Sequence, residues 1–448
     1  MSTKLRAKVQ NQSHSSTTIY MLSDNVLLDI FGFCLCNPTR LPLEKMKKWQ
    51  RLAYVCRRWR QIIFSSPCRL GLSLSCSYGI PVRKNLPFWP VTIPLSIDHP
   101  RLSPRPSIDE ENIIAALEQA DRVHRVDIFA SQPLMSKAET IMQKSYPALT
   151  HLGLEFGYNE PYVLPKGFLN GSSPCLQYLC LRRFLFPEVP TFLLSSHNLV
   201  TLKLEAMYQD CFISPEAMVE CLSGMTKLKT LSISFDEDDM DLFAFDQERT
   251  RLAFTTRVIL PSLTRFHFTG HCGFLEKFIA QIDAPLLLRL GITYHYDEDT
   301  DGVQASQLFR FVGHTENLKF DKFSRARVRF EDEVTLDCSR GKCPKASPGL
   351  LSITCPGLDT LLKCLDQVLD TAKFLGQFGT TRALSYVNHL SVNGNSTEGY
   401  VELLPFSRSF PAVEELRLSG IVGAVFASEL EDITEEMVTE IFPALHTI

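Results

Sequence analysis

Cysteine spacing is the first feature that could indicate chemistry, because thiolates bind zinc. Cys338 and Cys343 have four residues between them, and Cys355 and Cys364 follow further along the chain. Zinc modules use tight cysteine pairs, separated by about two to four residues and repeated at a set spacing. The pattern here is not typical of them, so we interpret most of the 14 cysteines as reduced thiols in apolar runs.

Other polar groups have the residue types of a reactive site but not the spacing. His267 and His271 are four positions apart, but Phe266 and Phe268 favour a strand there. The acidic run 236–241 lacks the glycine and closing glutamate of an EF-hand, so we interpret it as a surface loop. G-x-S-x-G, G-x-x-x-x-G-K-[ST], H-E-x-x-H and G-x-G-x-x-G are all absent. We therefore expect that this chain has no catalytic residues, binds no metal and no cofactor, and is not an enzyme.

Composition fits a folded chain with more than one part. Of 448 residues, 45% are hydrophobic and 21% are charged, which suggests two or three domains or one elongated repeat array. No run approaches the roughly 18 apolar residues of a transmembrane helix, and the polar start lacks a secretory signal. We expect a disordered segment over 1–19, a cytoplasmic or nuclear location and no membrane partner.

Two segments near the N-terminus have the apolar spacing of short amphipathic helices. The first begins after Ser23 or Asp24, either of which can cap a helix. Its apolar face consists of Val26, Leu27, Ile30 and Phe31. After a polar stretch over 37–42, the second segment has an apolar face of Trp49, Leu52, Cys56, Trp59 and Ile63, and Pro67 ends it.

Basic residues are concentrated in this head. Residues 1–90 have a net charge of +11, and the remainder has −15, which predicts two parts with different partners. A basic head can bind nucleic acid or an acidic protein. The arginines within 51–60 interleave with the apolar residues, so we interpret them as a helix flank and expect no nucleic-acid partner.

The pattern L-x-D-x-V-L-L-x-I-F, followed by a loop and W-x-x-L-x-x-V-C-R-R-W-R-x-I, resembles the F-box in the form common in large fungal families. The resemblance covers about residues 22–66, which places an F-box over 20–66, and it departs from the family at Ser23, where a proline is usual. It implies a module that binds a Skp-type adaptor and, through it, a cullin. The implied contact positions are Leu22, Val26, Leu27, Ile30, Phe31, Leu52, Val55, Cys56, Trp59 and Ile63. Some of these must instead hold the module together, and the sequence does not separate the two groups.

The rest of the chain repeats an apolar spacing of i, i+3, i+5. The copies begin at Val123, Leu149, Leu176, Leu199, Leu228, Leu263, Leu287, Val387 and Val413. Up to Leu287 the intervals are 23 to 29 residues, with one of 35, and leucine-rich repeats span about 20–29. We interpret each copy as a strand whose last two apolar residues face a shared core. This predicts an α/β leucine-rich-repeat-like solenoid over 121–448, with 67–120 as the connecting segment and its start.

Between the expected strands lie helical signals and departures from the repeat. A capping box at 107–110 and an N-cap at Ser214 with Pro215 predict helix starts, and 274–282 and 358–374 have helical spacing. The Asn or Cys of standard repeats is replaced by Gly157, Phe184, Met207 and Asp236, so we expect irregular curvature. Residues 294–350 fit poorly, and 325–336 could be a β-hairpin arm or a damaged repeat.

Residues between the core-facing positions of each strand point outward, and solenoids bind partners on such a concave face. Because aromatic residues and arginine dominate interfaces, we predict target contacts by Tyr178, Arg182, Lys203, Arg265, His267 and Arg289. The expected function is a substrate-recognition adaptor of a Skp–cullin–F-box ubiquitin ligase. The alternatives are a leucine-rich-repeat scaffold no longer attached to a ligase, and an enzyme or nucleic-acid binder built on the basic head.

Overall fold

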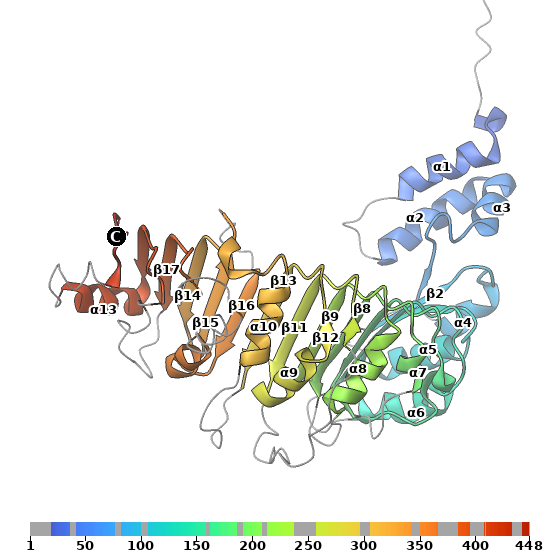
Figure 1. The fold of residues 1–448 in the computed structure, drawn as a ribbon. Coiled ribbons are helices and arrows are strands. Elements are labelled where there is room, and N and C mark those ends of the chain that lie inside the picture. The colour runs from blue at the N-terminus through green and yellow to red at the C-terminus, as the bar shows by residue number, and fades with distance from the viewer. Residues whose placement is uncertain are drawn as a thin grey trace, which may run out of the picture.

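The computed structural model describes residues 19–35, 42–76, 82–99, 106–157, 162–185, 191–207, 213–236, 257–295, 305–341, 350–365, 384–394, 407, 409–431 and 441–447. It is a mixed α/β structure with one long, mostly parallel sheet and a group of helices at its N-terminal end (Figure 1). The predicted α/β class is therefore confirmed. Residues 1–18, which make up most of the segment predicted to be disordered, lie outside the described residues, as do residues 237–241 of the acidic run 236–241.

Three helices precede the sheet: α1 (Asp24–Leu35), α2 (Pro42–Val55) and α3 (Arg57–Ser65). The Ser23 Oγ accepts a hydrogen bond from the Val26 N–H at 3.4 Å, as expected of a capping residue. The prediction of one helix after the loop was wrong. Cys56 has extended backbone angles and its Sγ accepts from the Trp59 N–H, so it ends one helix and caps the next. The first of these, α2, begins with a proline, as helices often do.

The main sheet has 14 strands. In spatial order they are β1 (Leu74–Ser75), β2 (Leu95–His99), β3 (Val123–Ala130), β4 (His151–Phe156), β6 (Tyr178–Arg182), β8 (Thr201–Met207), β9 (Thr230–Phe235), β11 (Arg265–Gly270), β13 (Arg289–Tyr294), β16 (Leu351–Cys355), β15 (Val334–Ser339), β14 (Arg325–Phe330), β17 (His389–Gly394) and β18 (Glu415–Ser419). Two small parallel pairs lie outside it, β5 (Tyr162–Val163) with β7 (Phe184–Leu185) and β10 (Val258–Ile259) with β12 (Ile282–Asp283).

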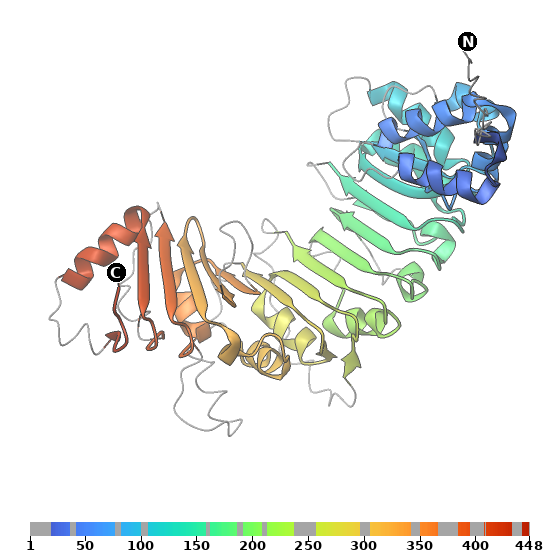
Figure 2. The same cartoon turned by 90° about the horizontal axis from the view of Figure 1, so that it is seen from above.

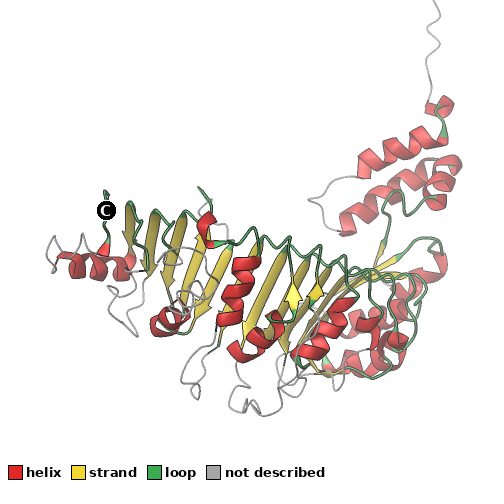
Figure 3. Cartoon of the chain, in the orientation of Figure 1, coloured by secondary structure: helices red, strands yellow, loops and turns green. Residues whose placement is uncertain are grey.

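Helices connect many of these strands and cover one face of the sheet (Figure 3). They are α4 (Val82–Asn85), α5 (Pro106–Leu117), α6 (Gln132–Met142), α7 (Thr191–Leu194), α8 (Pro215–Ser223), α9 (Cys272–Ile279), α10 (Ser306–His314), a helix over 358–365 and α13 (Gly420–Glu431). Short 3-10 turns span Ile19–Met21, Leu86–Phe88, Phe168–Gly171 and Phe320–Lys322. Seen from above, the sheet curves along its length, with most helices on the outer side (Figure 2).

Each of the nine predicted apolar spacings lies at the start of a strand of this sheet. The strands pair in register, so that Leu152, Leu179 and Leu202 form one buried row that continues through the neighbouring strands. The first residue of most copies lies in a turn before its strand. Its N–H donates to the carbonyl three positions earlier, as from Leu149 to Tyr146 at 3.1 Å and from Leu263 to Leu260 at 3.2 Å. The repeat therefore specifies both the turn and the core of each unit.

The described part of residues 294–350 departs from the parallel repeat, in line with the poor fit of its sequence. Strands β14 and β15 form an antiparallel hairpin, with Arg329 paired to Thr335 in register. The hairpin alternative is therefore confirmed, but it is not an arm: β15 pairs with β16, and β14 pairs with β17. The alternation of buried Ala326 and Val328 with polar neighbours allows these strands to share the core of the parallel ones.

Aromatic side chains pack together at or beside several positions where the sequence lacks the Asn or Cys of standard repeats. Phe184 is buried, with its ring centroid 6.0 Å from Phe156 and 6.2 Å from Tyr162. Phe235 packs in the same way on Phe268 at 6.1 Å. Edge-to-face contacts of this kind stabilise a core but do not form hydrogen bonds with backbone groups. The turns therefore use hydrogen bonds between backbone groups, such as the one from the Gly157 N–H to the Ala130 carbonyl.

Helix ends are capped both locally and over long distances. The Ser214 Oγ accepts from the Ala217 N–H at 3.2 Å and α8 ends at Gly224, as predicted. Helix α5 begins at Pro106, one residue before the predicted capping box. Helix α10 has no cap from its own N-cap residue, and Glu276 of α9 supplies one. The Glu276 carboxylate accepts from the N–H groups of Gln307 and Leu308 at 2.7 and 2.8 Å.

Replacing this distant cap tests how strongly it joins the two helices. Glu276→Ala leaves buried N–H groups without an acceptor, so we expect a loss of about 2 kcal/mol in the free energy of unfolding. Glu220→Ala, at an exposed position on α8, is the matched control and should change it little. Urea denaturation of both variants measures the difference. Equal stability of the two variants would show that the cap contributes nothing.

Candidate functional site

The predicted contact residues of the N-terminal helices fall into three groups by exposure. Leu27, Phe31 and Ile63 are at most 1% exposed and pack inside the helical group. Leu22, Leu52, Cys56 and Trp59 are half-buried. Val26, Ile30 and Val55 are 43%, 37% and 59% exposed. The structure thus separates the residues that hold the helices together from those that are free to contact a partner, which the sequence alone did not do.

Aromatic packing and one arginine hold the three helices together. The Phe31 and Trp59 ring centroids are 4.7 Å apart, which joins α1 to α3. The Arg58 guanidinium donates to the Asp24 carboxylate at 2.8 Å and to the backbone carbonyls of Tyr20 and Leu22 at 2.8 and 2.5 Å. Arg58 therefore fixes the start of α1 from inside the group, in agreement with its interpretation as part of a helix flank.

Helix α1 exposes an apolar stripe. Val26, Ile30 and Phe33 are spaced at i, i+4 and i+7, so they lie on one side of the helix. Phe33 is 83% exposed, and at the end of α2 Tyr54 is 77% exposed. Sequence reasoning missed Phe33 and Tyr54, although the helical spacing of Phe33 from Val26 was a usable signal. Contiguous exposed apolar side chains of this kind mark surfaces that bind other proteins.

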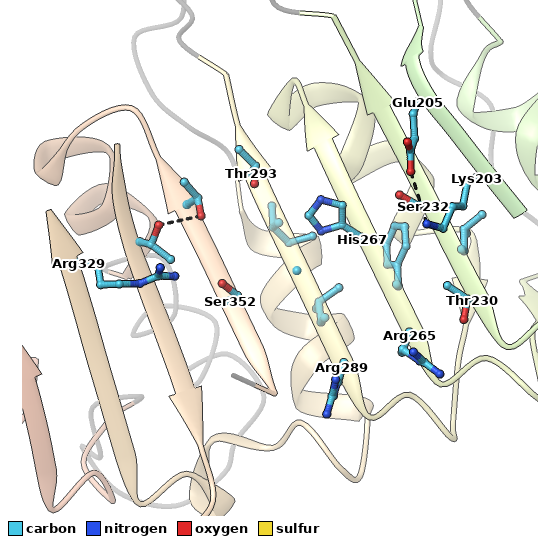
Figure 4. Close-up of a pocket in the computed structure, with 17 residues that line it drawn as sticks. Lys203, Glu205, Thr230, Ser232, Arg265, His267, Arg289, Thr293, Arg329 and Ser352 are labelled. Atoms are coloured by element: carbon cyan, nitrogen blue, oxygen red, sulfur yellow. Dashed lines mark hydrogen bonds and ion pairs between the residues drawn. The ribbon is translucent and has the colours of Figure 1, made fainter. Parts of the chain in front are cut away.

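The second candidate surface is the face of the main sheet whose side chains alternate with the buried ones. We call it the open face. It contains a hollow of about 470 Å³ that extends from β8 to β14. Lys203, Arg265, His267 and Arg289, four of the six predicted target contacts, line this hollow together (Figure 4). They come from three strands that the parallel register brings near one another.

Small side chains make the hollow and cations line it. The floor and walls include the hydroxyl residues Thr230, Ser232, Thr293, Thr335, Ser352 and Thr354. Gly291 makes room for the imidazole of the neighbouring strand, because a Cβ there would come within 2.7 Å of the His267 Nδ1. Arg329 adds a cation at the far side (Figure 4). Sequence reasoning missed Arg329 because it lies in the hairpin that fitted the repeat poorly.

The other two predicted target contacts, Tyr178 and Arg182, do not line the hollow. The Tyr178 ring stacks on His151, with centroids 4.0 Å apart and planes 2° apart. Arg182 forms an ion pair with Glu155 at 3.4 Å. These side chains are thus engaged with neighbours on the same face, in the part of the sheet that precedes the hollow.

Perturbed pKa values on the open face come mainly from burial. Burial raises the pKa of the Cys180 thiol to about 11 and that of Tyr178 to about 12, which disfavours a thiolate or phenolate nucleophile at neutral pH. Burial in the hollow lowers the pKa of His267, with Glu205 opposing the shift and Lys203 adding to it. The arrangement is therefore suited to binding anions by fixed cations rather than to activating a nucleophile.

Of the cysteines considered for zinc, Cys355 and Cys364 lie within hydrogen-bonding distance of each other. In the part of the chain that the structure describes, no three His, Cys, Asp or Glu side chains are placed to hold a metal ion. His267 lies on strand β11 and His271 follows it, as the strand interpretation predicted, and Cys343 lies outside the described residues. None of the helices in the described ranges has the length and apolar character to traverse a bilayer.

Comparison with protein-family models finds no match to this chain, and comparison with curated proteins finds no similar protein. The resemblance of residues 22–66 to a known family therefore stays a prediction. Two surfaces of the molecule indicate its function: the apolar stripe on α1 and the cation-lined hollow on the open face.

The contacts of Arg58 predict its effect on the helical group. Arg58→Ala removes an ion pair and two hydrogen bonds to backbone carbonyls, all partly exposed. We expect the free energy of unfolding of the three helices to fall by about 1 kcal/mol, and we expect this loss to be confined to them. Faster amide hydrogen exchange across α1, measured by mass spectrometry, would report it. The exposed neighbour Arg57→Ala is the control, and the same exchange rates in both variants would contradict the assignment.

Proposed function

We propose that this protein is the substrate-recognition adaptor of a Skp–cullin–F-box ubiquitin ligase. In this proposal residues 20–66 form the F-box and the curved sheet with its helices forms an irregular leucine-rich-repeat-like solenoid. The observation that carries the proposal is the apolar stripe of Val26, Ile30 and Phe33 on α1, together with the sequence resemblance of the same segment. A helix that exposes three apolar side chains at one-face spacing needs a partner to cover them.

The departure of the sequence from the family pattern is compatible with this proposal. A proline at position 23 would help to start the first helix. Here the Ser23 Oγ performs that role by accepting from the Val26 N–H. The start of α1 is further fixed by Arg58 through Asp24 and Leu22. The start of α1 is therefore capped and anchored without the proline.

The open face supplies the second half of the proposed function. Its hollow is lined by residues of the main sheet and the stripe by residues of α1, so one chain can hold a ligase adaptor and a target protein at once. Holding both raises the effective concentration of target lysines near the ubiquitin-conjugating enzyme. The proposed role needs no bond chemistry from this chain.

The stripe is tested by co-purification with a Skp-type adaptor. The double variant Val26→Asp, Ile30→Asp places two carboxylates where the proposal requires an apolar contact, so we expect at least a tenfold loss of recovered adaptor. Both positions are exposed, and the melting temperature should stay unchanged. Phe88→Asp is the matched control, because Phe88 is 85% exposed but lies outside the three helices.

Two outcomes would contradict the proposal. Full recovery of adaptor by the double variant would show that the stripe is not the contact surface. A folded wild-type chain that recovers no adaptor would favour the alternative, a repeat scaffold no longer attached to a ligase. Where the wild type recovers adaptor, Phe88→Asp should recover it too, since that variant changes exposed apolar surface outside the stripe.

A further inference from the structure

Two arginines stand next to each other in the hollow of the open face. Arg265 of β11 and Arg289 of β13 are register partners on adjacent parallel strands, so their backbones are about 4.8 Å apart. Both side chains are exposed and lie at the same end of the hollow (Figure 4). Like charges directly opposite each other on a sheet are destabilising. A like-charge pair in this place therefore indicates a ligand that brings negative charge.

Among the described residues, carboxylates neutralise the neighbouring cations Lys203 and Arg329 but not these two arginines. Lys203 lies 3.8 Å from the Glu205 carboxylate, and Arg329 lies 3.0 Å from the Asp337 carboxylate. Among the residues that the structure describes, neither Arg265 nor Arg289 has a carboxylate partner. In strand order, these two guanidinium groups, which have no carboxylate partner among the described residues, lie between Lys203 and Arg329, which are already paired.

The spacing of the charges indicates the form of the ligand. From β8, which holds Lys203, to β14, which holds Arg329, there are six strand-to-strand steps, or roughly 29 Å at about 4.8 Å each. A single anionic group could bridge Arg265 and Arg289, but it would leave most of the hollow unoccupied. An extended peptide of about nine residues fills that length, because it advances about 3.3 Å per residue and points alternate side chains to one side. Carboxylates two positions apart then meet adjacent guanidinium groups.

We propose that the hollow binds an extended acidic segment of the target protein, with Arg265 and Arg289 pairing to its carboxylates. This inference rests on the proposed role of the open face in target binding. The hydroxyl residues that line the hollow, such as Ser232 and Ser352, are small enough to admit a peptide backbone and can hydrogen-bond to it. Guanidinium groups bind carboxylates through two parallel hydrogen bonds, which gives orientation as well as attraction.

The test uses the full chain and three fluorescent nonapeptides measured by anisotropy. One peptide has Asp at alternate positions, one has Asn at the same positions, and one has a single phosphoserine in the Asn background. We expect saturable binding of the Asp peptide that weakens as salt is raised, and at least tenfold weaker binding of the Asn peptide. The double variant Arg265→Gln, Arg289→Gln should bind the Asp peptide at least tenfold more weakly than the wild type.

Arg417→Gln is the matched control, because Arg417 lies on β18 of the same face, outside the hollow, and forms an ion pair with Glu415. It should leave the affinity for the Asp peptide unchanged. The inference is overturned if the Asp peptide does not bind, if the double variant binds it as well as the wild type, or if the Asn peptide binds equally. Tighter binding of the phosphoserine peptide than of the Asp peptide would also overturn it and assign the hollow to a phosphorylated segment.

Adaptor recovery from the same preparations separates this inference from the proposed function. The Arg265→Gln, Arg289→Gln variant should recover the adaptor as the wild type does, because both arginines lie on the sheet and not on the helical group. A chain that recovers adaptor but binds no acidic peptide contradicts the inference alone. A chain that binds the acidic peptide but recovers no adaptor contradicts the ligase role and leaves the peptide site in place.

Discussion

The in-register pairing of parallel strands is the constraint on which the rest of this structure depends. Side chains alternate along a strand, so each aligned strand sends one set toward the helices and the other set to the open face. A slip of one residue at β8 would move Lys203 into the core and Leu204 out of it. Burial of Leu202 and Leu204 therefore also fixes where the polar side chains of the hollow stand.

The sequence predicts the regular part of the fold because the alternation of apolar and polar residues along each strand is visible in it directly. Each i, i+3, i+5 spacing begins a strand, and Ser214 caps its helix as expected. The sequence does not reveal a cap between residues far apart or a helix break at a single residue. Glu276 caps α10 across 31 positions to Gln307, and the helix break at Cys56 is fixed by its extended backbone. Neither leaves a periodic signal in the residues beside it.

The two surfaces differ in chemistry because local pattern, not net charge, decides what a surface attracts. The region after residue 90 is acidic overall, with −15 against +11 before it. Its hollow is nevertheless lined by cations, because one outward position on each of β11, β13 and β14 is an arginine that faces it: Arg265, Arg289 and Arg329. The basic head shows the reverse. Arg58 is used inside the helical group, and the surface left on α1 is the apolar stripe of Val26 and Ile30. Net charge predicted two parts, but not what each part exposes.

The hollow also depends on the segment that breaks the repeat. Insertion of the antiparallel hairpin places β15 and β14 between β16 and β17. Thr335 of β15 pairs with Thr354 of β16, and their hydroxyls are 3.1 Å apart. The row of small hydroxyl side chains that includes Ser352 therefore continues from β16 into the hairpin. Arg329 then stands at the far side on β14. A sheet of regular repeats alone would lack these strands. Departures from a regular pattern are where functional sites are expected, and here the departure extends the site across the junction.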